Sequence, residues 1–247
     1  MLLDANNPTA FAVILLVLFI AIVLRYFLAA GIFYTYYYVW KKEDFQDKKL
    51  GRKWKKNQLR NEIVWSMKSS IIFALAGGAL YWMWQNGYTA IYLDVKAFPL
   101  WYLPFSFILI AFLHETYYYW VHRWMHKPKV FRKVHKVHHD SFTPSPWTSF
   151  SFHPWESSLE AIILPLILLV VPVNIYVLGV YLIFMTISSV INHLDIEIFP
   201  EWFLKSKIGS AFIGATHHHY HHEEYNTNFG LYFTFWDKWM RSESQAG

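Results

Sequence analysis

Long apolar segments separated by short polar stretches make up most of this chain. Residues 10–40 are apolar apart from Arg25, and residues 63–84 and 98–121 form two further apolar runs. A helix of about 20 apolar residues is long enough to cross the hydrocarbon core of a bilayer. The pattern therefore predicts three membrane spans, at 10–40, 63–84 and 98–121.

Two shorter apolar segments follow, at 159–173 and 175–191, and Pro172-Val173-Asn174 marks a turn between them. Ser157 and Glu160 have the spacing of a capping box, which predicts a helix start here. Fifteen helical residues rise only ~22 Å, against a hydrocarbon thickness of ~30 Å. The pair is therefore either a re-entrant hairpin or a short spanning one, and in both cases its two ends lie at one face of the membrane.

The composition is that of a membrane protein. The 247 residues are 55% hydrophobic, 21% aromatic and only 16% charged. With this hydrophobicity, the formal charge of +5 indicates contacts with lipid headgroups rather than nucleic-acid binding. The absence of cysteine excludes disulfides and thiolate ligands. We expect an all-α, multi-pass helix bundle forming one integrated membrane domain, with N-terminal spans and a basic loop in residues 1–97 and the histidine-bearing region in residues 98–247.

The charge pattern predicts the orientation of this bundle. Residues 41–60 hold nine Lys or Arg against three acidic residues, so the positive-inside rule places this loop in the cytoplasm. The second and third spans then return the chain to the same side, and the hairpin also ends there. Arg25, inside the first span, is interpreted as paired with a carboxylate in the bundle rather than as extending to a headgroup.

Histidine is concentrated in three clusters with helical spacing. Residues at i, i+3 and i+4 share one helix face, and neutral imidazole binds zinc, copper, nickel and iron. A structural zinc site closes with four ligands, so these imidazoles predict two metal ions in one pocket of a cytoplasmic-side helical cap. A histidine-rich surface loop is the alternative, but it would not require the same spacing twice. The clusters are His122 and His126; His135, His138 and His139; and His218, His221 and His222.

Other polar residues have weaker assignments. Glu115 falls on the helical stripe of His122 and His126, and we expect it to orient a metal-bound imidazole; pairing with Arg25 is the alternative. His193 directly follows the apolar hairpin, which brings it beside the three clusters as a candidate ligand. Glu197 is a weaker candidate, because a carboxylate near the membrane surface is usually solvated.

Three further histidines are not assigned as ligands. His153, in Phe-His-Pro-Trp-Glu, is interpreted as a helix-entry residue. His217 and His219 fall outside the repeated spacing and receive no coordination.

Several motifs together resemble the fatty acid hydroxylase and sterol desaturase superfamily, over about residues 100–240. They are E-T-Y-Y-Y-W-V-H-R-W-M-H at 115–126, H-K-V-H-H at 135–139, F-H-P-W-E at 152–156, N-H at 192–193, H-H-Y-H-H at 218–222, N-T-N-F-G at 226–230 and W-D-K at 236–238. The chain departs from the family pattern at Glu115, where aspartate is common, and after His193, where some members carry another histidine. The resemblance implies the metal ligands His122, His126, His135, His138, His139, His193, His218, His221 and His222.

The resemblance also implies an activity: a membrane-bound oxygenase with two iron ions that uses O2 and external electrons to hydroxylate or desaturate a lipid C–H bond. Zinc is a metal that such a site can also hold in a structure. Sterol, fatty acyl, alkylglycerol and carotenoid substrates all remain open. Because the chain has no H-P-G-G haem segment, we expect a separate electron donor, which would be cytochrome b5-like, ferredoxin-like or a reductase.

The membrane setting predicts how a lipid reaches the metals. An apolar groove should run from the bilayer to them, lined by Tyr117, Tyr118 and Trp120 or by the hairpin. Two rival functions fit less well. Metal transporters place their ligands near the midplane on broken helices. A zinc metallohydrolase keeps an open coordination position, which eight or nine imidazoles would overfill.

Overall fold

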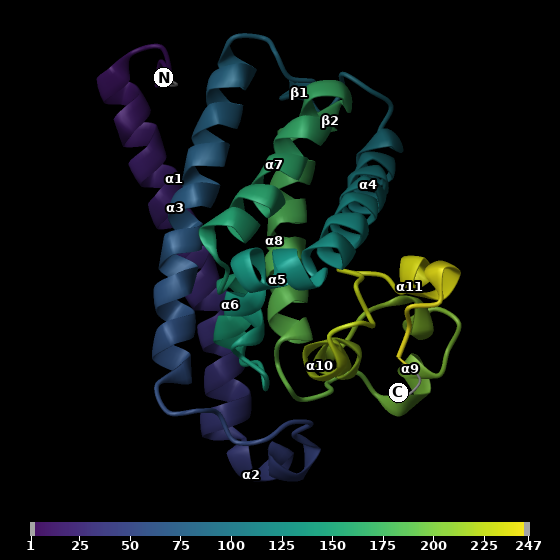
Figure 1. Ribbon diagram of the computed structural model, residues 1–247. Helices are drawn as coiled ribbons and strands as arrows, with labels where there is room; N and C mark the ends of the chain where they lie inside the picture. Colours follow the sequence, from purple (N-terminus) through teal and green to yellow (C-terminus); the bar gives the residue numbers. More distant parts are fainter. Residues whose placement is uncertain (1–2, 245–247) are drawn as a thin grey trace.

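A bundle of long helices forms the body of the protein (Figure 1). The computed structural model describes residues 3–244. The long helices are α1 (Pro8–Tyr34), α3 (Gln58–Gln85), α4 (Tyr102–Met125), α7 (Pro154–Val170) and α8 (Ile175–Asn192). The short elements are η1 (Thr35–Trp40), α2 (Lys42–Phe45), η2 (Gln46–Lys48), β1 (Ile91–Tyr92), α5 (Pro128–Val134), α6 (Lys136–His139), η3 (Pro146–Phe150), β2 (Val173–Asn174), α9 (Glu201–Leu204), η4 (Gly209–Ala211), α10 (Ala215–Glu224) and α11 (Phe235–Met240).

Three helical segments in the described part of the chain are long and apolar enough to cross a membrane: α1 with its π-helical extension η1, then α3, then α8. Two predicted apolar segments do not meet that criterion. The predicted span at 98–121 corresponds to α4, which begins later, at Tyr102, continues to Met125 and carries polar residues in its C-terminal half. The segment at 159–173 belongs to α7, whose 17 residues rise about 25 Å.

The α7–α8 hairpin reaches the same end of the bundle as the α3–α4 connection. Strands β1 and β2 pair in parallel there, with Ile91 opposite Val173 and Tyr92 opposite Asn174. The short helices α5, α6 and α10 gather away from this pairing, toward the opposite end (Figure 1). The basic loop after α1 and the histidine-bearing segments therefore share one end of the bundle.

The start of α7 differs from the sequence prediction. His153 caps the helix, because its Nδ1 accepts the backbone N–H of Trp155 at 3.3 Å, and Pro154 occupies the first turn without needing a donor. The helix-entry interpretation of His153 is therefore confirmed, and the capping box at Ser157 and Glu160 is wrong. Ser157 lies inside the helix, where its hydroxyl bonds Ser69 of α3 at 2.9 Å.

A buried carboxylate fixes the segment that follows α6. Glu62 of α3 is 2% exposed and accepts hydrogen bonds from Gln58 Nε2 at 2.8 Å, Ser141 Oγ at 2.7 Å and Ser145 Oγ at 2.5 Å. Ser69 Oγ also donates to the Phe152 carbonyl oxygen at 3.2 Å. These bonds hold residues 141–152 against α3, and this segment leads from the second histidine cluster into α7.

Arg25 has no carboxylate partner. Its Nε is buried without a hydrogen bond, and no ion pair involves it among residues 3–244. The predicted pairing inside the bundle, including the alternative with Glu115, is therefore wrong.

We predict that Glu62→Leu lowers the stability of the fold by about 3 kcal/mol, because two buried serine hydroxyls lose their acceptor. The apparent melting temperature of the purified protein in detergent measures this effect. Asn61→Ala, at the neighbouring exposed position, serves as the control and should leave that temperature unchanged. Equal melting temperatures for Glu62→Leu and the control would contradict the role given to Glu62.

Candidate metal centre

Four separate parts of the chain bring histidines to one place. The end of α4 supplies His122, and His126 is its C-cap. The segment α5–α6 supplies the second cluster, α10 supplies the third, and His193 is the C-cap of α8. Because α4 and α8 both end at the same level of the bundle, their last turns face the two short histidine-bearing helices (Figure 1).

The imidazoles divide into two groups whose ligand nitrogens lie within 4.8 Å of one another. The five-histidine group is His122, His126, His135, His139 and His221, and the four-histidine group is His138, His193, His218 and His222. Together they contain every residue that the sequence analysis proposed as a ligand. The groups are adjacent, because the rings of His139 and His222 are 4.5 Å apart and those of His135 and His138 are 5.2 Å apart.

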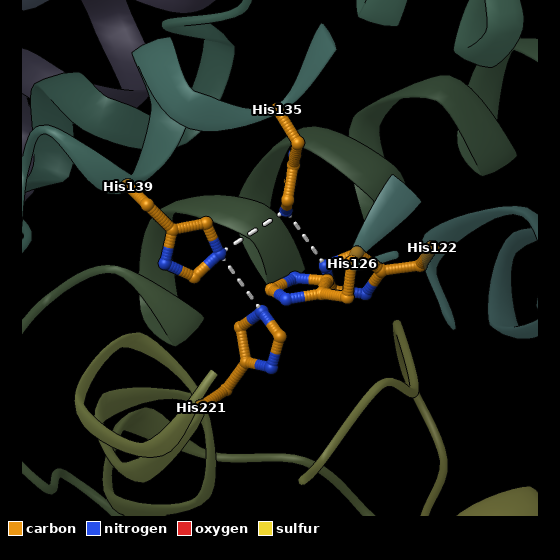
Figure 2. Close-up of side chains that lie close together, drawn as sticks. All are labelled: His122, His126, His135, His139 and His221. Carbon is orange, nitrogen blue, oxygen red and sulfur yellow. Dashed lines mark hydrogen bonds between the residues drawn. The ribbon is translucent and has the colours of Figure 1, made fainter. Parts of the chain in front are cut away.

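The five rings of the five-histidine group converge on one place, and printed Nε2 contacts link four of them (Figure 2). His135 Nε2 lies 3.0 Å from His122 Nε2 and 3.1 Å from His139 Nε2, and His139 Nε2 lies 3.2 Å from His221 Nε2. In the four-histidine group, His193 Nε2 lies 3.2 Å from His138 Nε2 and 3.0 Å from His218 Nε2. His218 and His222 are 3.2 Å apart at the same atoms.

Hydrogen bonds on the outer side of the rings fix which nitrogen is protonated. His122 Nδ1 donates to the Phe229 carbonyl oxygen at 2.9 Å, and His135 Nδ1 donates to Glu156 Oε1 at 2.6 Å. The facing Nε2 atoms of His122 and His135 therefore both carry bare lone pairs at 3.0 Å. His138 and His193 repeat this arrangement, with Nδ1 bonded to the carbonyl oxygens of Ser151 and Ser189.

Facing lone pairs repel unless a cation lies between them. Nitrogen ligands about 2.0–2.1 Å from a metal are about 2.9–3.4 Å apart in octahedral or tetrahedral geometry. The observed Nε2 separations of 3.0–3.2 Å fall in this range. The residues therefore fit a metal in each group, with imidazole as the donor set.

Burial keeps these imidazoles in the neutral form that binds metal. Removal from water lowers the pKa of His135 and His138 well below the usual value, and neighbouring imidazoles add to this effect. Burial also lowers the pKa of His221 to about 4, although its hydrogen bond to the Thr227 carbonyl oxygen opposes the shift. All three are therefore uncharged near pH 7.

Glu156 is a candidate functional residue that the sequence analysis did not identify. Its carboxylate is fully buried and accepts from His135 Nδ1, an arrangement that orients a metal ligand and increases its basicity. Glu156 lies in the Phe-His-Pro-Trp-Glu motif, one turn into α7. The sequence places Glu156 just after a predicted helix start, which is the only hint of its role that the sequence contains. The fold then shows that the first turn of α7 faces α5–α6.

Glu115 has a different role from the one predicted. Its Oε1 accepts the N–H of Leu231 at 3.0 Å, and its Oε2 accepts those of Tyr232 at 2.7 Å and Phe233 at 3.2 Å. It contacts neither an imidazole nor Arg25. The prediction that Glu115 orients a ligand directly is therefore wrong, because a closer set of unpaired backbone donors occupies both oxygens.

Glu115 instead holds the loop that supports two ligands. In this loop, the carbonyl oxygens of Thr227 and Phe229 accept from His221 and His122. Asp237 holds the same loop from α11, since its carboxylate accepts the N–H groups of Phe229 at 2.9 Å and Gly230 at 2.8 Å. A side chain at Gly230 would clash, because a Cβ there would lie 2.5 Å from the Phe233 carbonyl oxygen. The Asn-Thr-Asn-Phe-Gly and Trp-Asp-Lys motifs therefore support the centre together.

The weaker candidates lie outside both groups. Glu197 accepts the N–H groups of Phe199 and Thr216, each at 3.0 Å, and so ties the start of α10 to the segment after α8. His219 Nδ1 lies 3.0 Å from Asp195 Oδ1. His217 belongs to neither group, in agreement with the absence of a predicted coordination role.

An apolar cavity of about 240 Å³ leads from the bundle to the four-histidine group. His193 and His218 line it directly, with Tyr118 and several hairpin side chains around it. Tyr117 and Trp120, the other predicted groove residues, are not part of its lining. The Tyr117 hydroxyl bonds the Leu159 carbonyl oxygen, and Trp120 is 45% exposed on the outer face of α4.

Comparison with known proteins assigns the same region to one family. The model of the fatty acid hydroxylase family matches residues 107–242. Mouse lathosterol oxidase is 32% identical over 187 residues, which are 74% of this chain and 60% of that protein. A Delta(7)-sterol 5(6)-desaturase of Gibberella zeae is 27% identical over 237 residues, covering 95% of this chain and 64% of the relative.

A second Delta(7)-sterol 5(6)-desaturase, from Schizosaccharomyces pombe, is 26% identical over 99% of this chain and 70% of its own length. The chain thus spans about 60% of the length of the first curated relatives that it matches. No solved structure matches it.

We predict that Glu156→Gln lowers metal affinity about 10- to 100-fold, since His135 loses its charged partner. Metal bound per chain after dialysis against a graded chelator, read by elemental analysis, measures this. Ser158→Ala, an exposed position two residues along α7, is the matched control. Retention of metal at the wild-type chelator concentration would refute the role of Glu156.

Proposed function

This chain belongs to the fatty acid hydroxylase family, and on that premise we propose that it is a membrane-bound oxygenase acting on a lipid C–H bond. One observation carries the proposal: two groups of inward-facing imidazoles lie side by side, and one of them borders an apolar cavity inside a membrane bundle. The alignment of family members named for sterol oxidation supports the same conclusion.

Iron is the metal that we propose for both groups. A bound iron pair supplies activation of O2, which an unactivated C–H bond requires because no side chain can break one. The chain's own residues hold, orient and shield this pair. His122, His126, His135, His139 and His221 would hold one ion, and His138, His193, His218 and His222 would hold the other.

The protein residues around the groups have three separate tasks. The carbonyl oxygens of Phe229, Ser189 and Thr227 keep the protons of three rings on Nδ1, so that Nε2 remains free to bind metal. Glu156 places negative charge behind His135, which offsets part of the positive charge of a bound ion. Burial of the rings keeps bulk water away from the reacting centre.

The substrate that we propose is a sterol-like lipid, and the reaction is hydroxylation or desaturation. Relatives whose names specify lathosterol oxidation and Δ7-sterol 5(6)-desaturation support this class. The cavity supports it too, because leucine side chains from α1, α3, α7 and α8 line its inner part.

We also propose that the histidine groups lie on the cytoplasmic side, because they share one end of the bundle with the basic loop at 41–60. A separate electron donor would then reach the centre from that side. In the proposed division of labour, residues 1–97 add spans and the basic loop, and residues 98–247 hold the centre. Both parts pack into one membrane domain, since α1 and α3 contact α7 and α8.

The two rival functions remain testable alternatives. A metal transporter would place its ligands along a path across the bilayer, whereas here both groups lie at one end. A zinc metallohydrolase would need an open position on a site of about four ligands. Neither rival uses an apolar cavity that reaches the ligands.

We predict that cells expressing the wild-type protein gain a lipid changed by about +16 or −2 in mass, for insertion of oxygen or loss of two hydrogens. His138→Ala should abolish this product, because it removes a ligand of the four-histidine group. Comparative lipid mass spectrometry measures both, and His217→Ala, at a partly buried histidine outside the groups, is the control. Identical lipid profiles for wild type and His138→Ala, with full metal loading in both, would count against catalysis.

Metal removal gives an independent prediction. Chelation should abolish product formation, and Fe(II) added back under air should restore it, whereas Zn(II) should not. Product yield after each treatment, with and without O2, is the measurement. Hydrolysis of a lipid by the zinc-loaded protein in the absence of O2 would instead favour the hydrolase alternative.

A further inference from the structure

A stripe of exposed apolar side chains follows the outer face of α4. They recur at helical spacing, so they lie on one side of the helix, and none of them is charged. α4 runs beside α8, which is long and apolar enough to cross a membrane. The stripe therefore faces the lipid layer that α8 crosses. Its members are Phe105, Ile108, Phe112, Trp120 and Trp124.

The short helix α11 lies against the histidine-side half of this stripe. Phe235 stacks on Phe112 with ring centroids 5.7 Å apart, and the ring of Trp236 lies 5.6 Å from that of Trp120. The Trp236 indole N–H also donates to Thr116 Oγ1 at 3.1 Å. At a rise of about 1.5 Å per residue, Trp120 and Phe112 lie about 8 and about 20 Å before the end of α4. α11 is therefore beside α4 and not beyond its end.

Basic side chains mark the membrane surface next to this contact. α4 leads directly into α5, where four cations are exposed: Lys127, Lys129, Arg132 and Lys133. Lysine and arginine gather at the headgroup level of the cytoplasmic leaflet. Because the contacts of α11 begin about 8 Å before the end of α4, α11 lies on the bilayer side of this basic level.

α11 also directs apolar side chains outward. Trp239 is 66% exposed and Met240 is 37% exposed, although this helix has only six residues. The ring of Phe235 lies 5.1 Å from Trp239 and 6.1 Å from Phe233, and Phe233 lies 5.4 Å from the exposed ring of Phe212. These five side chains form one continuous surface, which we call the α11 patch. A continuous exposed apolar patch marks an interaction surface, whereas single exposed residues do not.

We propose that the α11 patch is a membrane-binding surface, which lies in the boundary between headgroups and acyl chains of the leaflet at the histidine end. Its partner is the bilayer lipid itself. The patch has the composition of an interfacial helix, because exposed Lys238 and Arg241 flank Trp239 and Met240. Tryptophan is enriched at this boundary, where its ring meets acyl chains and its N–H reaches water. The inference goes beyond the proposed oxygenase function and does not depend on it.

Continuity with α4 favours lipid over a protein partner. The apolar stripe continues from the α11 patch past Phe112 to Ile108 and Phe105, so one environment covers both surfaces. A fluid lipid layer does this without a complementary shape. A soluble partner would cover the patch and leave the adjoining stripe exposed.

The α11 patch is connected to the candidate metal centre. Asp237, in the middle of α11, accepts the N–H groups of Phe229 and Gly230. The carbonyl oxygen of Phe229 in turn accepts from His122 Nδ1. Contact of α11 with the bilayer therefore sets the level of the loop that supports this imidazole.

Site-directed spin labelling tests the proposal, because the chain contains no cysteine that would also be labelled. Trp239→Cys is labelled with a nitroxide and placed in nanodiscs of phosphatidylcholine and phosphatidylglycerol. Power-saturation electron paramagnetic resonance then measures collisions with O2, which concentrates in lipid, and with a water-soluble nickel chelate. The ratio of the two collision rates reports depth. We expect the label about 5–10 Å below the headgroup boundary.

Two further labels calibrate the measurement. Ile108→Cys, on the α4 stripe, should lie deeper in the acyl layer, and Asp47→Cys, exposed in the basic loop, should lie in water. Met240→Cys is a second label on the α11 patch and replaces Trp239→Cys if that variant does not fold. A melting transition at the wild-type temperature identifies the labelled chains that are folded.

A label on the α11 patch that meets the nickel chelate as often as the Asp47 label does would overturn the inference. Shielding from both reagents would mean that protein covers the patch, and dipolar broadening between labels would identify a second copy of this chain. Either result also rules out the bilayer as the partner. None of these readouts involves turnover, so failure of the proposed oxygenase function would leave them unchanged.

Discussion

The structure depends on the mutual repulsion of imidazole nitrogens that are held face to face away from water. His122 and His135, like His138 and His193, use their outer nitrogens as donors and so turn bare lone pairs toward each other at 3.0 and 3.2 Å. Such a set is stable only around cations, and a site built this way gives binding free energy directly to the fold. The bundle, the cap and the loops are all arranged to hold these rings at that spacing.

Three carboxylates hold the segments that carry these rings, and each acts through a different element. Glu62 holds residues 141–145 against α3, Glu156 bonds His135, and Glu115 collects three N–H groups of the loop after α10. Buried carboxylates are costly unless they are fully hydrogen-bonded. Glu62 and Glu115 each lie where three donors converge, whereas Glu156 accepts only from His135 Nδ1 and its other oxygen is buried without a partner.

Much of this could be predicted from the sequence, because local spacing encodes it. Apolar runs located the long helices within a few residues, and the repeated histidine spacing selected the rings that the fold gathers into two groups. The sequence did not predict correctly which side chains contact each other when they are far apart along the chain. The register of Glu115 on α4 places it near His122, but the sequence cannot show that the backbone of residues 231–233 lies closer. The predicted pairing of Arg25 with a carboxylate was wrong for the same reason, because the sequence of a membrane span does not reveal which neighbouring helix faces a given residue. Glu156 was missed because its partner lies 21 residues earlier, on a helix of its own.

The histidines of each group come from distant parts of the chain, and this spacing has a consequence for biosynthesis. The five-histidine group joins His122 to His221, and the four-histidine group joins His138 to His222. While a ribosome is still translating α8, neither group has its α10 members, and the loop that anchors His122 does not yet exist. All the long helices of the bundle thus precede α10 in the chain, so any ion that these groups bind would be fully held only after those helices have been made.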